Sequence, residues 1–183
     1  MHDEWPQSSE ALVSAHCHFG ADQVRGQPAF DAAILLDLAE GRRGVIGIET
    51  KYHEHIKRER TPHENKRLPR YRDVTERSGV FRPGWESKLI GTDLQQIWLD
   101  HLLALSMLQH PSGEWTWCRF VVVYPAANAS VAKAVARYAD VLQDASTFQT
   151  HTIEDLLDTH CLHSPSTESR FRDRYLWTTK SVQ

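Results

Sequence analysis

Two apolar runs joined by a short connection constrain this fold more than any other feature. The runs are FDAAILLDL (30–38) and GVIGIETKY (44–52), and the connection AEGRR between them contains Gly41. Apolar, β-branched runs separated by three to five residues that include a glycine are typical of a β-hairpin. We therefore predict an antiparallel hairpin whose loop is formed by residues 39–43.

Three charged residues are expected to share one face of this hairpin. Residues two apart in a strand point the same way, so Glu49 and Lys51 lie on one side. With residues 39–43 in the loop, Leu38 faces Gly44 and Asp31 faces Lys51. Asp31 is then a direct neighbour of Lys51 and a diagonal neighbour of Glu49, at about 7–8 Å between backbones. A slip of one residue would take Asp31 off this face.

Two carboxylates and an ammonium at one end of an apolar hairpin need a partner, because unpaired buried charge costs several kcal/mol. A Mg²⁺ ion held by one or two carboxylates and by waters would satisfy them. Such an ion polarises a phosphodiester and lowers the pKa of an attacking water. Lys51 would orient that water and stabilise the developing negative charge. The alternative is a surface salt bridge between Asp31 and Lys51, worth about 0–1 kcal/mol.

The tripeptide Glu-x-Lys is not specific by itself. The chain contains three copies, Glu49-Thr50-Lys51, Glu64-Asn65-Lys66 and Glu86-Ser87-Lys88. Only the first follows a buried strand and has an aspartate at the matching position of the preceding strand. Context, and not the tripeptide, indicates the site.

The remaining elements predict one α/β domain over residues 1–183. Residues 53–91 contain Pro62, Pro69 and Pro83 and show no sustained hydrophobic periodicity. We therefore expect a polar, basic insertion that is mostly loop. Thr92 and Gln95 fit a capping box for a helix to Gln109. The expected helices span 8–18, 92–109, 130–143, 153–161 and 166–176, and the expected strands after the hairpin span 118–125 and 148–152. Each of these strands is reached through a helix, which indicates a three-layer fold with a mixed β-sheet flanked by helices.

At this point the chain resembles the PD-(D/E)XK nuclease superfamily, which has the restriction-endonuclease-like fold. The resemblance rests on Asp31, the 18-residue step to Glu49, and Glu49-x-Lys51 at the end of VIGIETKY. The run GTDLQQIWLDHLLALSML is similar to a bacterial branch of restriction-endonuclease-like proteins. Two features depart from the pattern. Ala29 and Phe30 separate Pro28 from Asp31, and only residues 22–27 remain for the first core strand.

The resemblance implies a metal-dependent nuclease that hydrolyses phosphodiester bonds in DNA with Mg²⁺, or Mn²⁺ in its place. It implies that Asp31 and Glu49 are metal ligands, that Thr50 is a ligand through its carbonyl, and that Lys51 is the catalytic lysine. Glu10 matches an additional acidic residue of some members, and Gln95 or Gln96 matches a glutamine near the metal.

Charge is distributed unevenly and indicates where DNA would bind. The net charge of the chain is −3, yet residues 51–82 contain ten Lys and Arg against five Asp and Glu. A basic segment on an acidic body is consistent with a phosphate-contacting surface, and a solvated loop is the alternative. The candidate nucleic-acid-binding residues are Lys57, Arg58, Arg60, Lys66, Arg67 and Arg70.

Several classes are disfavoured. No apolar run reaches the roughly 18–20 residues of a membrane helix, so we expect no membrane partner. The start, MHDEWPQSSE, is acidic and polar where a secretory signal is basic and then apolar, and Cys17, Cys118 and Cys161 are far apart. We therefore expect a cytoplasmic protein. Double-strand cleavage would further predict a two-fold homodimer.

Other interpretations stay open. His53, His55 and His63 could form a zinc site, although a solvated loop is the simpler interpretation. His101 is expected to be a satisfied core histidine, and Trp98, Trp115 and Trp117 are expected to fill or edge the core. The whole chain could instead be a non-catalytic module that binds nucleic acid or protein on the same fold, or a plain α/β scaffold of an oligomer.

Overall fold

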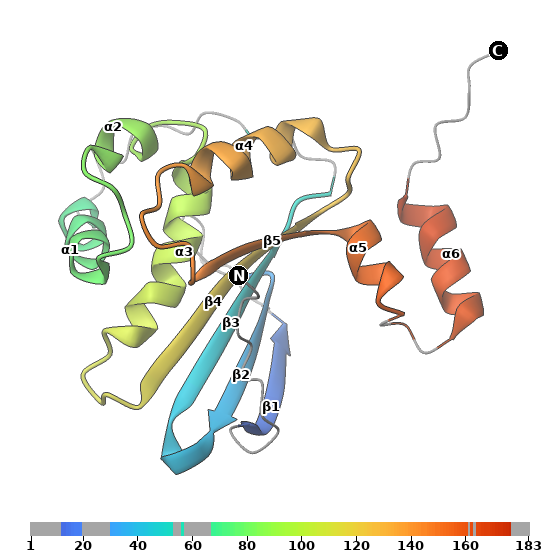
Figure 1. Cartoon of the computed structure of the whole chain (residues 1–183), viewed down its shortest axis with the longest axis horizontal. Coiled ribbons are helices and arrows are strands. Elements are labelled where there is room, and N and C mark those ends of the chain that lie inside the picture. The colour runs from blue at the N-terminus through green and yellow to red at the C-terminus, as the bar shows by residue number, and fades with distance from the viewer. Residues whose placement is uncertain are drawn as a thin grey trace.

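The computed structural model describes residues 30–52, 56, 67–160, 162 and 164–176, together with the backbone of residues 12–19. Its centre is a five-stranded sheet in the order β1-β2-β3-β4-β5 (Figure 1). The strands are β1 (Leu12–Phe19), β2 (Ala32–Leu38), β3 (Arg43–Thr50), β4 (Trp115–Tyr124) and β5 (Phe148–Thr152). The first three are antiparallel, whereas β3 with β4 and β4 with β5 are parallel. The predicted α/β class with a mixed sheet is confirmed.

The main core lies between one face of the sheet and four helices. The helices of the described chain are α1 (Leu68–Ser78), α2 (Trp85–Leu89), α3 (Gln95–Leu108), α4 (Ala129–Ala139), α5 (Ile153–Asp158) and α6 (Pro165–Tyr175). Residues of α1 to α4 pack with Val45, Phe120 and Val122 of the sheet in one cluster. A smaller cluster that includes Ile46 and Val121 lies on the opposite face. Among the described residues, no helix is both long and apolar enough to cross a membrane.

The hairpin of β2 and β3 forms as predicted, but its register differs by two residues. Gly44 pairs with Leu36 and not with Leu38. The reason is a tighter turn: Ala39–Gly41 form a short 3-10 helix, and the Leu38 N–H donates to the Arg42 carbonyl at 2.8 Å. Gly41, at φ 71°, supplies the left-handed residue with which such three-residue loops end.

A shift of two residues keeps every side chain on its predicted face, because the strand repeat is two. The partner of Asp31 nevertheless changes. Ala32 pairs with Ile48, so Asp31, one residue before Ala32, lies beside Glu49 and not beside Lys51. The predicted direct pair of Asp31 with Lys51 is therefore wrong.

The predicted helix over residues 8–18 is also wrong. Residues 12–19 form β1, which pairs antiparallel with β2. This strand gives hydrogen-bond partners to the backbone along the second edge of β2, a gain that outweighs a weak local preference for helix. The first core strand is thus earlier in the chain than residues 22–27, which lie outside the described residues.

The expected insertion contains more regular structure than predicted. Both α1 and α2 fall within residues 53–91. Pro69 lies in the first turn of α1, where proline favours a helix, and Gly79 ends α1 at φ 65°. Tyr71 of α1 packs against Trp98 of α3, with ring centroids 6.1 Å apart. Residues 53–55 and 57–66 lie outside the described residues.

The long helix begins later than its predicted cap. It starts at Gln95, and the Thr92 hydroxyl accepts from the Leu94 N–H at 3.1 Å. The Gln95 side chain accepts from the Gly91 N–H at 2.7 Å and so does not complete a capping box with Thr92. The later cap at Thr152 does form a capping box, with Asp155.

Candidate active site at the end of β3

A buried ion pair lies at the end of β3. The Lys51 Nζ is 2.6 Å from the Glu49 Oε1, and the two residues are only 7% and 6% exposed. They share the sheet face of Val45, which packs under the helices. Removing either residue would leave the other charge buried without a partner, at a cost of about 3–5 kcal/mol. Each of the two charges therefore depends on the other for its burial.

The Asp31 carboxylate is oriented by the residue between Glu49 and Lys51. Its Oδ2 accepts from the Thr50 backbone N–H and from the Thr50 hydroxyl, each at 2.7 Å. Two donors on one oxygen fix the carboxylate at the carboxyl end of β3, beside a strand that runs parallel to β4. Open α/β sheets commonly place their ligands outside such strand ends.

A glycine sets the approach of the segment that carries Asp31. The Phe30 ring packs over Gly47, where an added Cβ would lie 2.2 Å from the ring. The same ring stacks on Phe120 in the core, at a centroid distance of 6.1 Å. Phe30 therefore anchors the start of β2 through the core, and Asp31 follows it directly.

Of the two candidate glutamines, Gln96 reaches the ion pair. Gln96 lies in the first turn of α3, and its Nε2 donates to the Glu49 Oε1 at a distance of 3.4 Å. Gln95 holds the Gly91 backbone and lies buried at 3% exposure. The structure thus brings together Glu49, Lys51 and Gln96, with Asp31 bound to the adjoining Thr50.

Three residues that the sequence analysis did not single out hold the chain just after Lys51. Asn128 caps α4 and also donates from its Nδ2 to the Tyr52 carbonyl at 3.3 Å. The Tyr52 hydroxyl donates to the Tyr175 carbonyl at the end of α6, at 2.7 Å. The strong N-cap preference of Asn before a helix could have identified Asn128, but the contact with Tyr175 bridges 123 residues and left no local signal.

The donor set at this strand end suits a hard cation. Carboxylate and carbonyl oxygens with completing waters are what Mg²⁺ takes in proteins, and Asp31, Glu49 and the Thr50 carbonyl provide such oxygens. Over the residues that the structure describes, no group of three or more His, Cys, Asp and Glu could hold a metal.

The other predicted site residues are only partly described. Arg67 and Arg70 are exposed at the start of α1. The predictions for Glu10, Lys57, Arg58, Arg60 and Lys66, and for a zinc site at His53, His55 and His63, lie outside the described residues. The competing triplet at residues 86–88 lies on α2, where Glu86 pairs with Arg72 and not with Lys88.

His101 is a satisfied core residue, as predicted. Its two ring nitrogens lie 2.9 Å from the Tyr138 hydroxyl and 2.9 Å from the Thr147 hydroxyl. Complete burial lowers the pKa of His101 to about 3, so the ring is neutral at physiological pH. It has no contact with the Glu49 and Lys51 pair that would suit a general base.

Two hollows in the structure lie apart from the ion pair. One of about 790 Å³ is lined by the first half of β4 and the end of α3, and one of about 420 Å³ lies between α2 and α4. Neither is lined by Asp31, Glu49 or Lys51. These two hollows are therefore separate from the candidate site at the end of β3.

Comparison with known proteins agrees with this geometry. A family model described as the PD-(D/E)XK nuclease superfamily matches residues 20–177. The chain belongs to the PD-(D/E)XK nuclease superfamily. No curated protein and no solved structure matches it. The match spans the hairpin of β2 and β3, the strands β4 and β5, and all of the helices α1 to α6. Nucleases of the superfamily typically depend on a divalent metal ion, which fits the oxygen donors at the end of β3.

Proposed function

We propose that this PD-(D/E)XK protein is a metal-dependent deoxyribonuclease whose centre is Asp31, Glu49 and Lys51. The observation that carries the proposal is the buried pair of the Glu49 carboxylate and the Lys51 ammonium, 2.6 Å apart at the end of a parallel strand. A buried ion pair is weak support for stability, since well-packed apolar residues often replace one without loss. A role in chemistry explains better why both charges lie there.

Each residue has a distinct role in the proposed mechanism. Asp31, Glu49 and the Thr50 carbonyl would hold Mg²⁺ or Mn²⁺. When bound, the ion supplies Lewis acidity, polarising the phosphodiester and lowering the pKa of the attacking water. The Lys51 ammonium orients that water and stabilises negative charge on the phosphate. Thr50 fixes the Asp31 carboxylate, and the Gln96 amide donates to the Glu49 oxygen that Lys51 also contacts.

The substrate we propose is DNA, contacted by basic residues of the segment 51–82. Of the six candidate nucleic-acid-binding residues, the structure describes Arg67 and Arg70, both exposed at the start of α1. A non-catalytic module on the same fold, which binds nucleic acid or protein through this segment, is the second candidate. The Glu49 and Lys51 pair favours the nuclease, because a module that only binds has no use for a buried ion pair.

The test is cleavage of supercoiled plasmid and single-stranded DNA with Mg²⁺ or Mn²⁺. Wild type is compared with Glu49→Ala and Lys51→Ala. The second triplet offers matched controls, Glu86→Ala and Lys88→Ala, which remove the same chemical groups from an exposed helix. We expect metal-dependent cutting that both site variants lose and both control variants keep. Conversion to linear plasmid without a nicked intermediate would additionally support a two-fold dimer, to be checked by sedimentation.

Two outcomes would contradict the proposal. If folded, metal-supplied wild type cuts neither substrate, the binding module becomes the better account. If cutting survives both Glu49→Ala and Lys51→Ala, the activity belongs to another site or to a contaminant.

A further inference from the structure

The C-terminal helix is attached beside the proposed catalytic lysine. Tyr175, the last residue of α6, contacts Tyr52 in two ways. The Tyr52 hydroxyl donates to the Tyr175 carbonyl, and the two rings meet edge to face with centroids 5.6 Å apart. Since Tyr52 directly follows Lys51, the C-terminal end of α6 contacts the residue next to the proposed catalytic lysine.

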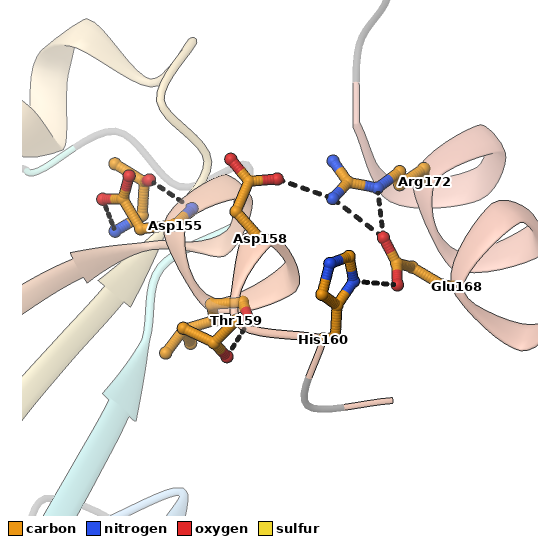
Figure 2. Close-up of polar contacts among 8 residues, drawn as sticks. Asp155, Asp158, Thr159, His160, Glu168 and Arg172 are labelled. Carbon is orange, nitrogen blue, oxygen red and sulfur yellow. Dashed lines mark hydrogen bonds and ion pairs between the residues drawn. The ribbon is translucent and has the colours of Figure 1, made fainter. Parts of the chain in front are cut away.

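One of the three arginines of α6 is committed to internal ion pairs. Arg172 contacts the Asp158 carboxylate at 2.8 Å and the Glu168 carboxylate at 2.9 Å (Figure 2). Glu168 also lies 3.6 Å from the His160 Nδ1. These contacts tie α6 to the end of α5, so the helix is held at both of its ends.

The other two arginines point to solvent. Arg170 and Arg174 are exposed, and within the described part of the chain neither forms an ion pair. They are four residues apart, which places them on the same side of the helix about 6 Å apart along its axis. The Arg174 guanidinium lies 5.3 Å from the centroid of the Tyr175 ring, the ring that meets Tyr52 edge to face. The one exposed acid near them on α6 is Asp173.

We propose that Arg170 and Arg174 form a phosphate-contacting surface that places nucleic acid at the end of β3. The proposal rests on the proposed nuclease function and adds a second contact region to the segment 51–82. Two cations about 6 Å apart suit successive phosphates of one DNA strand. The spacing of these phosphates is about 3.4 Å along the duplex axis and is greater along the backbone itself. Contacts of this kind position a strand without reading its sequence.

The position of α6 predicts an order of effects. Arg174 is adjacent to the residue that meets Tyr52, and Arg170 lies one turn further away. Arg174 should therefore contribute more to the affinity for nucleic acid. Asp173 on the same helix should oppose binding, and its removal should strengthen it.

The test measures binding of the full chain to a 30-base-pair DNA duplex of arbitrary sequence by fluorescence anisotropy, with EDTA present and over a range of salt. The variants are Arg170→Gln, Arg174→Gln and the double variant, with Asp173→Asn as a change of opposite sign. Arg42→Gln is the matched control. It removes one exposed positive charge at the hairpin turn, about 30 Å from Lys51 at 3.3 Å per strand residue.

We expect each arginine variant to raise Kd severalfold and to lower the slope of log K against log salt by about 1, and the double variant to lower it by about 2. Asp173→Asn should lower Kd, and Arg42→Gln should leave both quantities unchanged. In cleavage assays the arginine variants should raise KM and leave kcat near that of wild type.

Unchanged binding in the double variant would overturn this proposal, as would an equal effect of Arg42→Gln, which would mean that only total charge matters. Either result leaves the nuclease intact if wild type still cuts DNA and Lys51→Ala does not. A wild type that neither binds nor cuts DNA would overturn both proposals.

Discussion

At the scale of single residues, the proposed site depends on one threonine that orients the Asp31 carboxylate, which we propose as a metal ligand. Both hydrogen bonds to the Asp31 Oδ2 come from Thr50, one from its backbone and one from its hydroxyl. Thr50→Val removes only the hydroxyl, and removal of such a supporting contact typically costs about 10–100-fold in metal affinity or activity. We expect a loss in this range, measured as the Mg²⁺ concentration for half-maximal cleavage.

Thr50→Ser is the matched control, because it keeps the hydroxyl and should cleave at close to the wild-type metal concentration. Equal behaviour of the Val and Ser variants would show that the hydroxyl does not orient Asp31.

His101 makes a prediction about stability and pH. Its pKa is about 3 in the folded protein because burial disfavours the charged ring, while an unfolded histidine has its ordinary value of 6.5. Between these values the unfolded chain binds the additional proton, so the free energy of unfolding falls as the pH falls from 6.5 toward 3. The slope from this one group approaches about 1.4 kcal/mol per pH unit.

Urea unfolding at several pH values would measure this slope. His101→Gln should lower the number of protons taken up on unfolding by about one, and the slope with it. His110→Gln, at an exposed position, should leave the slope unchanged. An unchanged slope in His101→Gln would show that the ring is protonated within the folded core.

At the scale of elements, the contact between β2 and β3 sets the position of Asp31. A Cβ at position 47 would overlap the Phe30 ring, so Gly47→Ala must displace Phe30 and, with it, Asp31. Overpacking of this kind costs about 1–3 kcal/mol. We expect this loss in the free energy of unfolding, together with reduced cleavage.

A double-mutant cycle tests the cause. Phe30→Leu should partly relieve the overlap, so the double variant should lose less stability than the two single variants added together. Simple additivity would mean that Gly47 is required for another reason.

Sequence patterns predicted the elements with local signals and missed those set by distant contacts. The hairpin strands and β4 are apolar runs, and their turn residues lie beside them. Residues 12–19 form the strand β1 because their backbone pairs with the edge of β2. The helix α1 is stabilised by packing of Tyr71 against Trp98, which lies 27 positions later in the chain. Pro69 signalled a loop, although its place in a first helical turn makes it compatible with α1.

The site was predicted in the same uneven way. The alternation of the strand placed Glu49 and Lys51 together whatever the register, whereas the Asp31 carboxylate bonds to Thr50, the residue between them. The turn at Ala39–Gly41 decided which of them lies beside Asp31, and its closure depends on backbone angles that composition does not reveal. The attachment of α6 through Tyr175 had no local signal.

At the scale of the whole molecule, we propose that holding the metal and using it fall to different residues. Asp31, one residue before β2, and Glu49 of β3 would provide the oxygens, while Lys51 would contribute charge to the reaction. This division of roles is the central claim. It is tested by measuring Mn²⁺ binding directly by electron paramagnetic resonance and assaying DNA cleavage in the same samples. Asp31→Asn and Glu49→Gln should lose both Mn²⁺ binding and cleavage. Lys51→Met should bind Mn²⁺ and fail to cut. Undiminished Mn²⁺ binding in both carboxylate variants, or cleavage by Lys51→Met at the wild-type rate, would contradict the account.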